Sequence, residues 1–359
     1  MTTDPLQNAG GTREATPGAL RGGARILVAT FLSLVVCLLA AVLWVFHGSN
    51  QLPGEADQTF FVSRGQSFAS IVDSLESRGI IRNRALFVFT AKMYGGAERV
   101  RVGKYAVGNG ISNAALFQML RSGKGNLLIP VTIPEGSRIR AQAKLFARMT
   151  GIDSSKYARL ALDPLFARSL GIDQTSLEGY LLPDTYELYW EQDEREILKH
   201  QVENFQHFFN DSLKSRAAAF NWDAHRTLTF ASIVEGEAVL NDERPIIAGV
   251  YHNRLQKRMK LEADPTVQYM ITDGPRRILY SDLRTANPYN TYRYPGLPPG
   301  PVNNPGRASI LASLYPAQHG YLFFVANGHG GHWFARTYED HLRYVRMYKR
   351  QRARQIVKG

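Results

Sequence analysis

The stretch "ILVATFLSLVVCLLAAVLWVF", Ile26–Phe46, decides how this chain is organised, because it is apolar throughout and carries no charged residue. As an α-helix it rises about 31 Å, which is enough to cross the hydrocarbon core of a bilayer. A cleaved signal peptide has an apolar core of only about 7–15 residues, followed by a small-x-small cleavage site. The stretch "VLWVFHGSNQ" at its end contains no such site. The sequence therefore predicts one transmembrane helix over residues 26–46.

The charges that flank this helix predict its orientation. Arg13, Arg21 and Arg25 precede it, whereas no Lys or Arg follows it until Arg64. Positive charge favours the cytoplasmic side, so residues 1–25 are expected to form a cytoplasmic tail and the body of the protein to lie outside. The single cysteine, Cys37, lies within the span and gives the exported part no disulfide. We therefore expect a single-pass protein of the cell (inner) membrane with an extracytoplasmic or periplasmic body.

The overall composition is that of a globular protein with an excess of positive charge. The 359 residues include 43 Lys+Arg and 31 Asp+Glu, a net charge of +12, and 44% are hydrophobic. The length leaves room for two domains. The basic residues are spread along the chain, and no zinc finger, KH loop or RNP-type motif is present, so no nucleic-acid partner is expected. The same charge suits an anionic membrane surface or an acidic wall polymer.

Residues 58–126, which follow a predicted linker over residues 47–57, have the pattern of a small α+β unit. Ser112 or Asn113 caps its last predicted helix and Gly123 ends it. Strands are predicted over 59–62 and in "VGKYAVG", and earlier helices end at Gly79 and at about Tyr94. The unit resembles a LysM module, a glycan-binding fold, with extra material between its helices. A core without a ligand explains the same apolar positions, so both alternatives stay open.

Residues 127–359 are expected to form a larger mixed α+β domain. A strand, a Pro-Glu-Gly turn and a basic helix begin it, and helical segments continue to Gly171. From there to about His332 the chain is dense in aromatic, Gly, Pro, Asn and acidic residues. The end of the chain, "HLRYVRMYKRQRARQIVKG", predicts a basic helix whose charged side chains face the solvent. The predicted fold class is thus α+β, with a transmembrane helix, a LysM-like subdomain and a catalytic domain.

The segment "FASIVEGEAVLNDERP", Phe230–Pro245, places two glutamates in a stretch that predicts a buried helix. At about 100° per residue, Glu235 shares a face with Leu228 and Ala231, and Glu237 points elsewhere, towards water. An inward carboxylate costs several kcal/mol unless it is paired, hydrogen-bonded or protonated. Glu235 is therefore either a core residue in an ion pair, for which Arg254 is a candidate, or part of a site.

Three further blocks carry polar and aromatic side chains that suit carbohydrate. They are "LEGYLLPDTYEL" (177–188), "NRLQKRMKLEADPTVQY" (253–269) and "PYNTYRYPGLPPGPVNNPG" (288–306), and the last is too rich in Pro and Gly for regular structure. Amides and carboxylates match sugar hydroxyls, and aromatic rings match sugar C–H faces. The predicted substrate-binding residues are Glu178, Tyr180, Asp264, Asn290, Tyr292 and Asn303.

Each of these residues has a structural alternative. Glu178 and Asp184 suit a cap and a turn. Asp264 before Pro265 is typical of a helix N-cap followed by proline at the first helical position. His329 and His332 in "NGHGGHWF" are spaced like zinc ligands, but no third ligand has the expected spacing, so neither a metal nor a cofactor is predicted.

Taken together, these blocks and "YLFFVANGHGGHWF" resemble the endolytic murein transglycosylases of the YceG-like family, in order and in spacing. With the transmembrane helix and the LysM-like unit, the resemblance covers nearly the whole chain after residue 25. It implies a lyase that cleaves the β-1,4 bond between N-acetylmuramic acid and N-acetylglucosamine without water, leaves 1,6-anhydro ends and terminates strand growth. Glu235 would be its catalytic acid and base. The implied partners are peptidoglycan glycan strands, the cytoplasmic membrane and wall synthases.

Two other functions remain open from the sequence. A hydrolase would use Glu178 and Glu235 as a pair of carboxylates. A non-catalytic scaffold would bind the wall through the LysM-like unit and recruit synthases.

Overall fold

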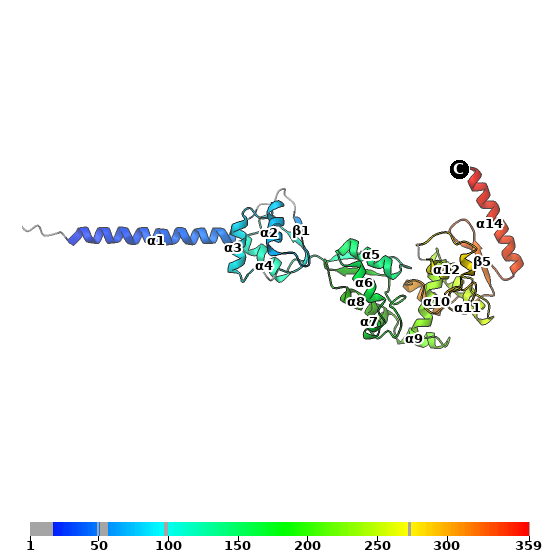
Figure 1. Cartoon of the computed structure of the whole chain (residues 1–359). Helices are drawn as coiled ribbons and strands as arrows, with labels where there is room; N and C mark the ends of the chain where they lie inside the picture. Colours follow the sequence, from blue (N-terminus) through cyan, green and yellow to red (C-terminus); the bar gives the residue numbers. More distant parts are fainter. Residues whose placement is uncertain (1–16, 49, 51–56, 97–99, 272–273, 359) are drawn as a thin grey trace, which may run out of the picture. The chain divides into compact units, whose positions relative to one another are not determined.

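The computed structural model describes residues 17–358 except 49, 51–56, 97–99 and 272–273 (Figure 1). Most of the predicted cytoplasmic tail and of the predicted linker therefore lies outside the described residues. The chain divides into two compact units, Met1–Asn126 and Leu127–Gly359. Both contain helices and short antiparallel strand pairs, so the fold class is α+β.

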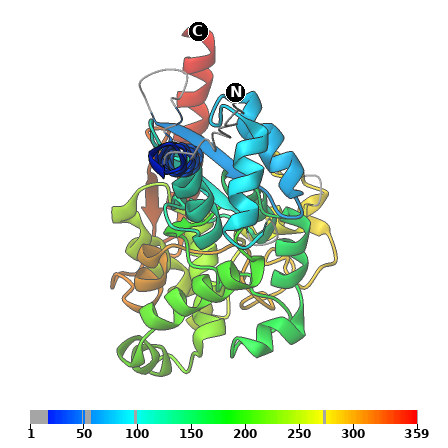
Figure 2. The ribbon, with the colours of Figure 1, turned by 90° about the vertical axis from the view of Figure 1, so that its left-hand side faces the viewer.

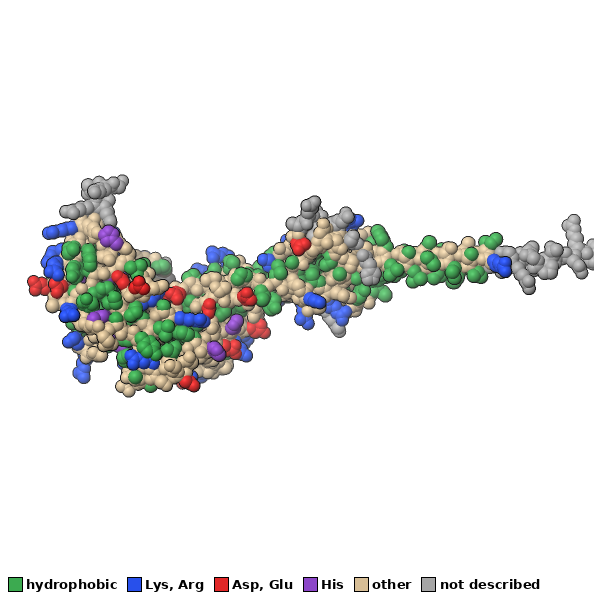
Figure 3. Space-filling model, turned by 180° about the vertical axis from the view of Figure 1, so that it is seen from behind, with side chains coloured by type: hydrophobic (Ala, Val, Ile, Leu, Met, Phe, Trp, Pro, Cys, Tyr) green, Lys and Arg blue, Asp and Glu red, His purple; other side chains and the backbone are tan. Residues whose placement is uncertain are grey.

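The first helix, α1, spans Pro17–His47. Its segment Arg25–Trp44 is long and apolar enough to cross a membrane, and none of it is buried inside the protein. Figure 2 views this helix along its axis, and the space-filling view shows apolar side chains along it (Figure 3). Leu27 and Phe31 are 72% and 67% exposed. Because a helix that is apolar on all sides needs an apolar environment, α1 is a membrane-span candidate at the predicted position.

The rest of the first unit is a two-stranded antiparallel sheet with three helices. The strands are β1, Gln58–Val62, and β2, Gly103–Val107, and the helices are α2, Phe68–Ser77, α3, Arg84–Met93, and α4, Asn113–Ser122. Ser112 caps α4 by accepting a hydrogen bond from the backbone N–H of Ala115, and Gly123 ends it with φ 75°. Phe60, Phe87, Tyr105 and Phe117 lie in its core. These strands and helices agree with the sequence prediction.

The second unit begins with another antiparallel pair and its helices. Strand β3, Ile129–Thr132, pairs with β4, Thr185–Leu188, so that the block at residues 177–188 ends in a strand. The helices of this part are α5, Ile139–Thr150, α6, Ser154–Ala161, α7, Pro164–Ser169, α8, Glu194–Phe208, and α9, Asp211–Ala218. Asp153, Asp163 and Asp193 cap three of them with their side chains.

Helix α10, Ala224–Glu237, is the central element of the remainder. It packs against α11, Arg244–Gln256, α12, Asp264–Met270, and α13, Arg307–Leu314. The remaining elements are β5, Phe323–Ala326, its antiparallel partner β6, His332–Ala335, and α14, Tyr338–Lys358. Every residue from Thr227 to Val234 is buried, so α10 is covered on all sides there. Beyond this stretch the C-terminal end of α10 is less covered, because Gly236 is exposed and Glu237 is half-buried, so the prediction that Glu237 faces water holds only in part.

Candidate active site

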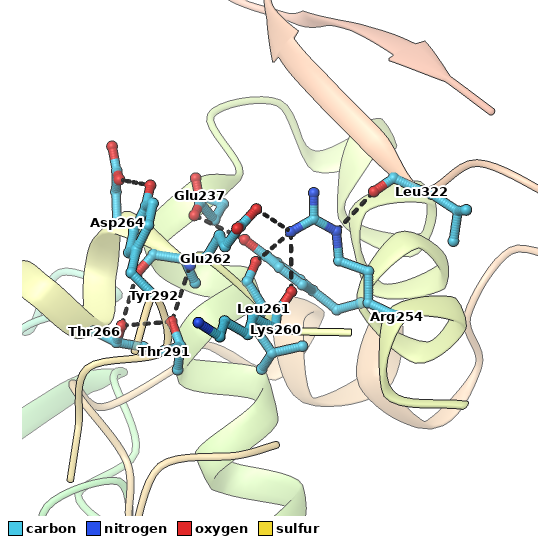
Figure 4. Close-up of polar contacts among 12 residues, drawn as sticks. Glu237, Arg254, Lys260, Leu261, Glu262, Asp264, Thr266, Thr291, Tyr292 and Leu322 are labelled. Carbon is cyan, nitrogen blue, oxygen red and sulfur yellow. Dashed lines mark hydrogen bonds and ion pairs between the residues drawn. The ribbon is translucent and has the colours of Figure 1, made fainter. Parts of the chain in front are cut away.

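A cleft of about 530 Å³ lies at the C-terminal end of α10. Its walls come from α10, α11, α12, strand β5, the start of β6, the start of α14 and the loop 288–306. Its polar side chains include Glu237, Tyr251, Arg254, Glu262, Asp264, Tyr292, His332 and His341. Many of them appear in Figure 4, where Glu237, Glu262 and Asp264 lie near Tyr292 and Arg254.

Gly236 allows α10 and α12 to approach closely at this point. A Cβ atom on Gly236 would lie 2.5 Å from Cγ of Pro265, which is closer than real side chains come. Only glycine fits here without a shift of one helix. This contact brings Glu237, the last residue of α10, beside Asp264, the first residue of α12.

Glu237 is held by two hydrogen-bond donors inside the protein. The hydroxyl of Tyr251 donates to its Oε1 at 2.8 Å, and the backbone N–H of Asp264 also donates to the carboxylate. Burial raises the pKa of Glu237 to about 7, with a further increase from the Asp264 carboxylate and opposing effects from the two donors and Arg254. Near neutral pH, both the protonated and the ionised form are therefore present. This is the property of a group that gives a proton and then takes one.

Asp264 and Tyr292, both predicted to bind substrate, face each other in the cleft. The Tyr292 hydroxyl donates to Oδ1 of Asp264 at 2.6 Å. Burial and this carboxylate hold the pKa of Tyr292 well above its usual value. The alternative that Asp264 is an N-cap was wrong, because Ala263 has the cap position and α12 has no side-chain cap hydrogen bond. Its carboxylate is turned to Tyr292 instead.

Arg254 forms one wall of the cleft through contacts with the backbone. Its Nε donates to the carbonyl of Leu322 at 2.7 Å and its Nη1 to that of Leu261 at 2.7 Å (Figure 4). Its ion pair, at 3.3 Å, is with Glu262. The suggested pairing of Arg254 with Glu235 was therefore wrong.

Glu235 faces the protein, as predicted, but it is engaged in a different contact. Its side chain is only 6% exposed, and its Oε1 lies 2.9 Å from Nη1 of Arg244. The backbone N–H of Gly306 donates to its Oε2 at 2.9 Å. Arg244 also pairs with Glu135 at 3.2 Å. Glu235 is not among the described residues that line the cleft.

Glu178 belongs to a buried network that connects three segments of the chain. It accepts hydrogen bonds from the backbone N–H of Ile139 at 3.2 Å and from Nδ2 of Asn304 at 2.8 Å. Oδ1 of Asn304 in turn accepts from the backbone of Gly179 and Leu181. Burial raises the pKa of Glu178 to about 7. These contacts use its carboxylate to join the segments, and it does not line the cleft with Glu237.

The other three predicted binding residues are also not among the described residues that line this cleft. Tyr180 is buried and its hydroxyl lies 3.2 Å from Nδ1 of His225. Asn290, in the loop 288–306, donates to the backbone carbonyl of Thr285, just before that loop, at 2.9 Å. Asn303 donates to that of Ser232 at 2.9 Å. Each of them thus holds a loop or a helix in place.

The structure adds residues that the sequence did not indicate, above all Tyr251. Tyr251 is separated from Glu237 by a turn and most of a helix, so no local pattern relates the two. His332 lines the cleft with its Nδ1 2.6 Å from a carboxylate oxygen of Glu243, while His329 lies 2.8 Å from the side chain of Gln351. Among the described residues there is no group of three or more His, Cys, Asp or Glu arranged for a metal.

Comparison with known proteins defines the class to which this fold and cleft belong. A model of the YceG-like family matches residues 60–347. The chain is 31% identical over 295 residues to the endolytic murein transglycosylase of Bacillus subtilis (strain 168), covering 78% of this chain and 81% of that protein. It is 27% identical over 333 residues to the endolytic murein transglycosylase of Streptococcus pneumoniae serotype 2 (strain D39), covering 82% of this chain and 59% of that protein.

A solved structure agrees with these relatives. The crystal structure of a yceG-like protein from Listeria monocytogenes superimposes with a TM-score of 0.59 at 29% identity, over 81% of this chain and 99% of that one. This chain therefore belongs to the YceG-like family. The resemblance stated from the sequence is confirmed, and so is the predicted enzyme class at the level of the family, whose curated relatives are named murein transglycosylases.

Proposed function

We propose that this protein is a membrane-anchored endolytic lytic transglycosylase. It cleaves nascent peptidoglycan strands between N-acetylmuramic acid and N-acetylglucosamine and leaves 1,6-anhydro ends. The names of its relatives support the substrate. The observation that carries the proposal is Glu237, a buried carboxyl whose pKa is raised to about 7 and which lines a cleft.

Glu237 handles a proton twice in this reaction. In its protonated form it gives the proton to the glycosidic oxygen that leaves. As a carboxylate it then takes the proton from the 6-hydroxyl of the muramoyl residue, and that oxygen attacks the anomeric carbon of the same sugar. Attack within one bound sugar needs no second carboxylate, and a well-oriented intramolecular nucleophile supplies several kcal/mol of the barrier. Tyr251 and the backbone N–H of Asp264 keep the carboxylate in place during both steps.

We assign this role to Glu237. The family resemblance had implied Glu235 as the catalytic acid and base. A general acid must begin protonated and must reach the substrate. Glu235 is held by Arg244 and by the backbone N–H of Gly306, and it is not among the described residues that line the cleft. The contacts of Glu235 fix the end of α10, so its role is to position the helix that carries Glu237.

The cleft also offers groups that match a sugar. Asp264 and Tyr292 present a carboxylate and a hydroxyl in the same cleft as the acid. The pair of Glu178 and Glu235, required by the two-carboxylate hydrolase, is engaged elsewhere in buried contacts. The geometry supports the transglycosylase better for this reason.

Membrane anchoring completes the proposal. The apolar segment Arg25–Trp44 spans the membrane with its N-terminal end in the cytoplasm, because Arg13, Arg21 and Arg25 are on that side. The enzyme then meets strands as wall synthases extend them, and cutting terminates their growth. In residues 58–126, the order β1–α2–α3–β2 supports a LysM-like unit that contacts glycan, with α4 as an addition.

Product analysis tests the reaction. The full chain in detergent is incubated with purified glycan strands in water labelled with oxygen-18, and the products are measured by mass spectrometry. The proposal predicts 1,6-anhydro-muramoyl ends without the label. Reducing ends that carry the label would show a hydrolase, and a chain that binds strands without cutting them would be the scaffold.

A further inference from the structure

A large cavity in the first unit has no role in the reaction proposed above. It measures about 1110 Å³ and lies beside α4. Ala115, Gln118, Met119 and Ser122 of that helix line it, a spacing that places them on one face of the helix. The core of the unit lies elsewhere, among residues such as Leu116, Phe117 and Leu120. The cavity therefore occupies the outer face of α4.

This cavity lies at the end of the membrane-span candidate. The ring of Phe46, two residues after Trp44, is 6.0 Å from the ring of Tyr94, which lines the cavity. The backbone N–H of Asn50 donates to the carbonyl of Ile111 at 2.9 Å, and Ile111 also lines the cavity. Two separate contacts thus connect the chain directly after the span to the cavity wall. When α1 crosses the membrane, the cavity is at the level of the lipid headgroups.

The side chains around the cavity combine three cations with apolar surface. Arg101, Arg121 and Lys124 line it together with Ile111 and Met119, and no carboxylate is among the described lining residues. None of the three cations forms an ion pair with a carboxylate in the part of the chain that the structure describes. The guanidinium of Arg121 donates to the backbone carbonyl of Tyr94, which holds it at the wall. Cations suit a phosphate, and the apolar residues suit a hydrocarbon chain attached to it.

Apolar side chains next to the end of α1 extend this surface towards the membrane. Phe89 and Met93 of α3 are 50% and 64% exposed, and the Phe89 ring lies 6.0 Å from that of Phe46. Exposed apolar residues beside a span are typical of a surface in contact with the interfacial region of a bilayer.

From these observations we propose that the cavity binds the phosphate headgroup of an anionic membrane lipid. The lipid holds the first unit against the outer surface of the membrane in addition to the span. This inference rests on the proposed membrane anchoring, and it is independent of the reaction at Glu237. Arg101, Arg121 and Lys124 contact the phosphate, and Ile111 and Met119 contact the upper part of the acyl chain.

The test uses the full chain purified in a neutral detergent. Phosphatidylglycerol is titrated in and bound lipid is counted by native mass spectrometry, with phosphatidylcholine, which is zwitterionic and has no net charge, as the comparison. The wild type is expected to bind one phosphatidylglycerol at least tenfold more tightly than phosphatidylcholine. The double variant R101Q/K124Q is expected to lose roughly fivefold in affinity for each cation removed. Arg121 is kept, because its contact with Tyr94 also supports the fold.

Two further variants separate charge from folding. R78Q/K104Q makes the same change in charge at two cations that rest on the rings of β1 and do not line the cavity, so its lipid binding should equal that of the wild type. R101K/K124R keeps both charges and should bind within about twofold of the wild type. Equal binding of the two lipids, or equal losses in R101Q/K124Q and R78Q/K104Q, would overturn the proposal. Displacement of the lipid by an equal concentration of glycerol phosphate would do so too, since the site would then be one for free phosphate.

The same preparation keeps this inference apart from the proposed function. Flotation with vesicles tests the anchoring, and formation of anhydro ends tests the enzyme. A chain that floats and cuts strands but shows no preference for phosphatidylglycerol would refute the lipid site alone.

Discussion

Replacing Glu237 and Glu235 with Gln, one at a time, should change the stability of the second unit in opposite directions. In the wild type, burial raises the pKa of Glu237 from 4.5 to about 7. The folded protein therefore binds this proton more tightly than the unfolded chain does. The resulting stability is fully present below pH 4.5 and is lost as the pH rises through 7. Gln is neutral at every pH and does not have this loss.

The size of the effect follows from the shift. A change of that size in pKa corresponds to about 3 kcal/mol, so above pH 8 the E237Q variant should be more stable than the wild type by about 2–3 kcal/mol. At pH 4, where Glu237 is largely protonated in both the folded and the unfolded chain, the two should be nearly equal. The E235Q variant instead breaks a pair with Arg244, which is 7% exposed on its side chain. Because Glu135 still neutralises part of that charge, the loss should be about 3 kcal/mol, the lower end for a broken buried pair.

Thermal unfolding followed by tryptophan fluorescence measures both effects. Trp190, Trp222 and Trp333 lie in the second unit, and the fourth tryptophan, Trp44, lies in the apolar span. For a unit of this size each kcal/mol shifts Tm by about 2–4 °C. The Tm of E237Q should therefore exceed that of the wild type by about 4–12 °C at pH 8.5 and match it at pH 4, and E235Q should lie below the wild type at both. A lower Tm for E237Q at pH 8.5, or an equal gain at both values of pH, would refute the reasoning.

Three other changes have defined outcomes. Y251F removes the hydrogen bond at 2.8 Å that lowers the pKa of Glu237; the pH at which kcat/KM declines should rise by about 1–2 units, and an unchanged midpoint would count against the assigned acid. G236A places a Cβ 2.5 Å from Cγ of Pro265 and should cost about 1–3 kcal/mol of stability and reduce kcat, with G108A, whose Cβ would have no contact closer than 3.6 Å, as the control. N304A removes partners from Glu178, Gly179 and Leu181 and should lower the free energy of unfolding by about 3 kcal/mol without moving the pH midpoint of activity; a shifted midpoint would place Glu178 in the reaction.

Local signals were sufficient to predict the helices and strands of the first unit and its long apolar helix. Ser112 and Gly123 are cap residues with short-range contacts, and strands β1 and β2 show in their apolar alternation. The loop 288–306 could also be predicted from the local sequence, because its Pro and Gly content excludes regular structure. In each case the relevant interactions lie within a few residues of one another, so the sequence contains them.

The arrangement of the site could not be predicted in this way, because it depends on contacts between distant segments. A helical projection of α10 gave Glu235 the inward position correctly, but it could not show that all sides of the helix are buried from Thr227 to Val234. The ion pair of Glu235 with Arg244 and the hydrogen bonds of Glu237 with Tyr251 and Asp264 involve neighbouring helices, so they appear only in the folded structure. The glycine between the two glutamates is the residue that permits this arrangement, through its contact with Pro265.

Rates of anhydro-end formation by E237Q and E235Q, compared at a temperature where both remain folded, test the central assignment most directly. Removal of a group that transfers a proton in both steps should lower kcat by about 10²–10⁴-fold in E237Q. The E235Q variant, which loses a positioning contact, should stay within about tenfold of the wild type at the same temperature. An E237Q protein that cuts strands at nearly the wild-type rate while E235Q is inactive would contradict the account.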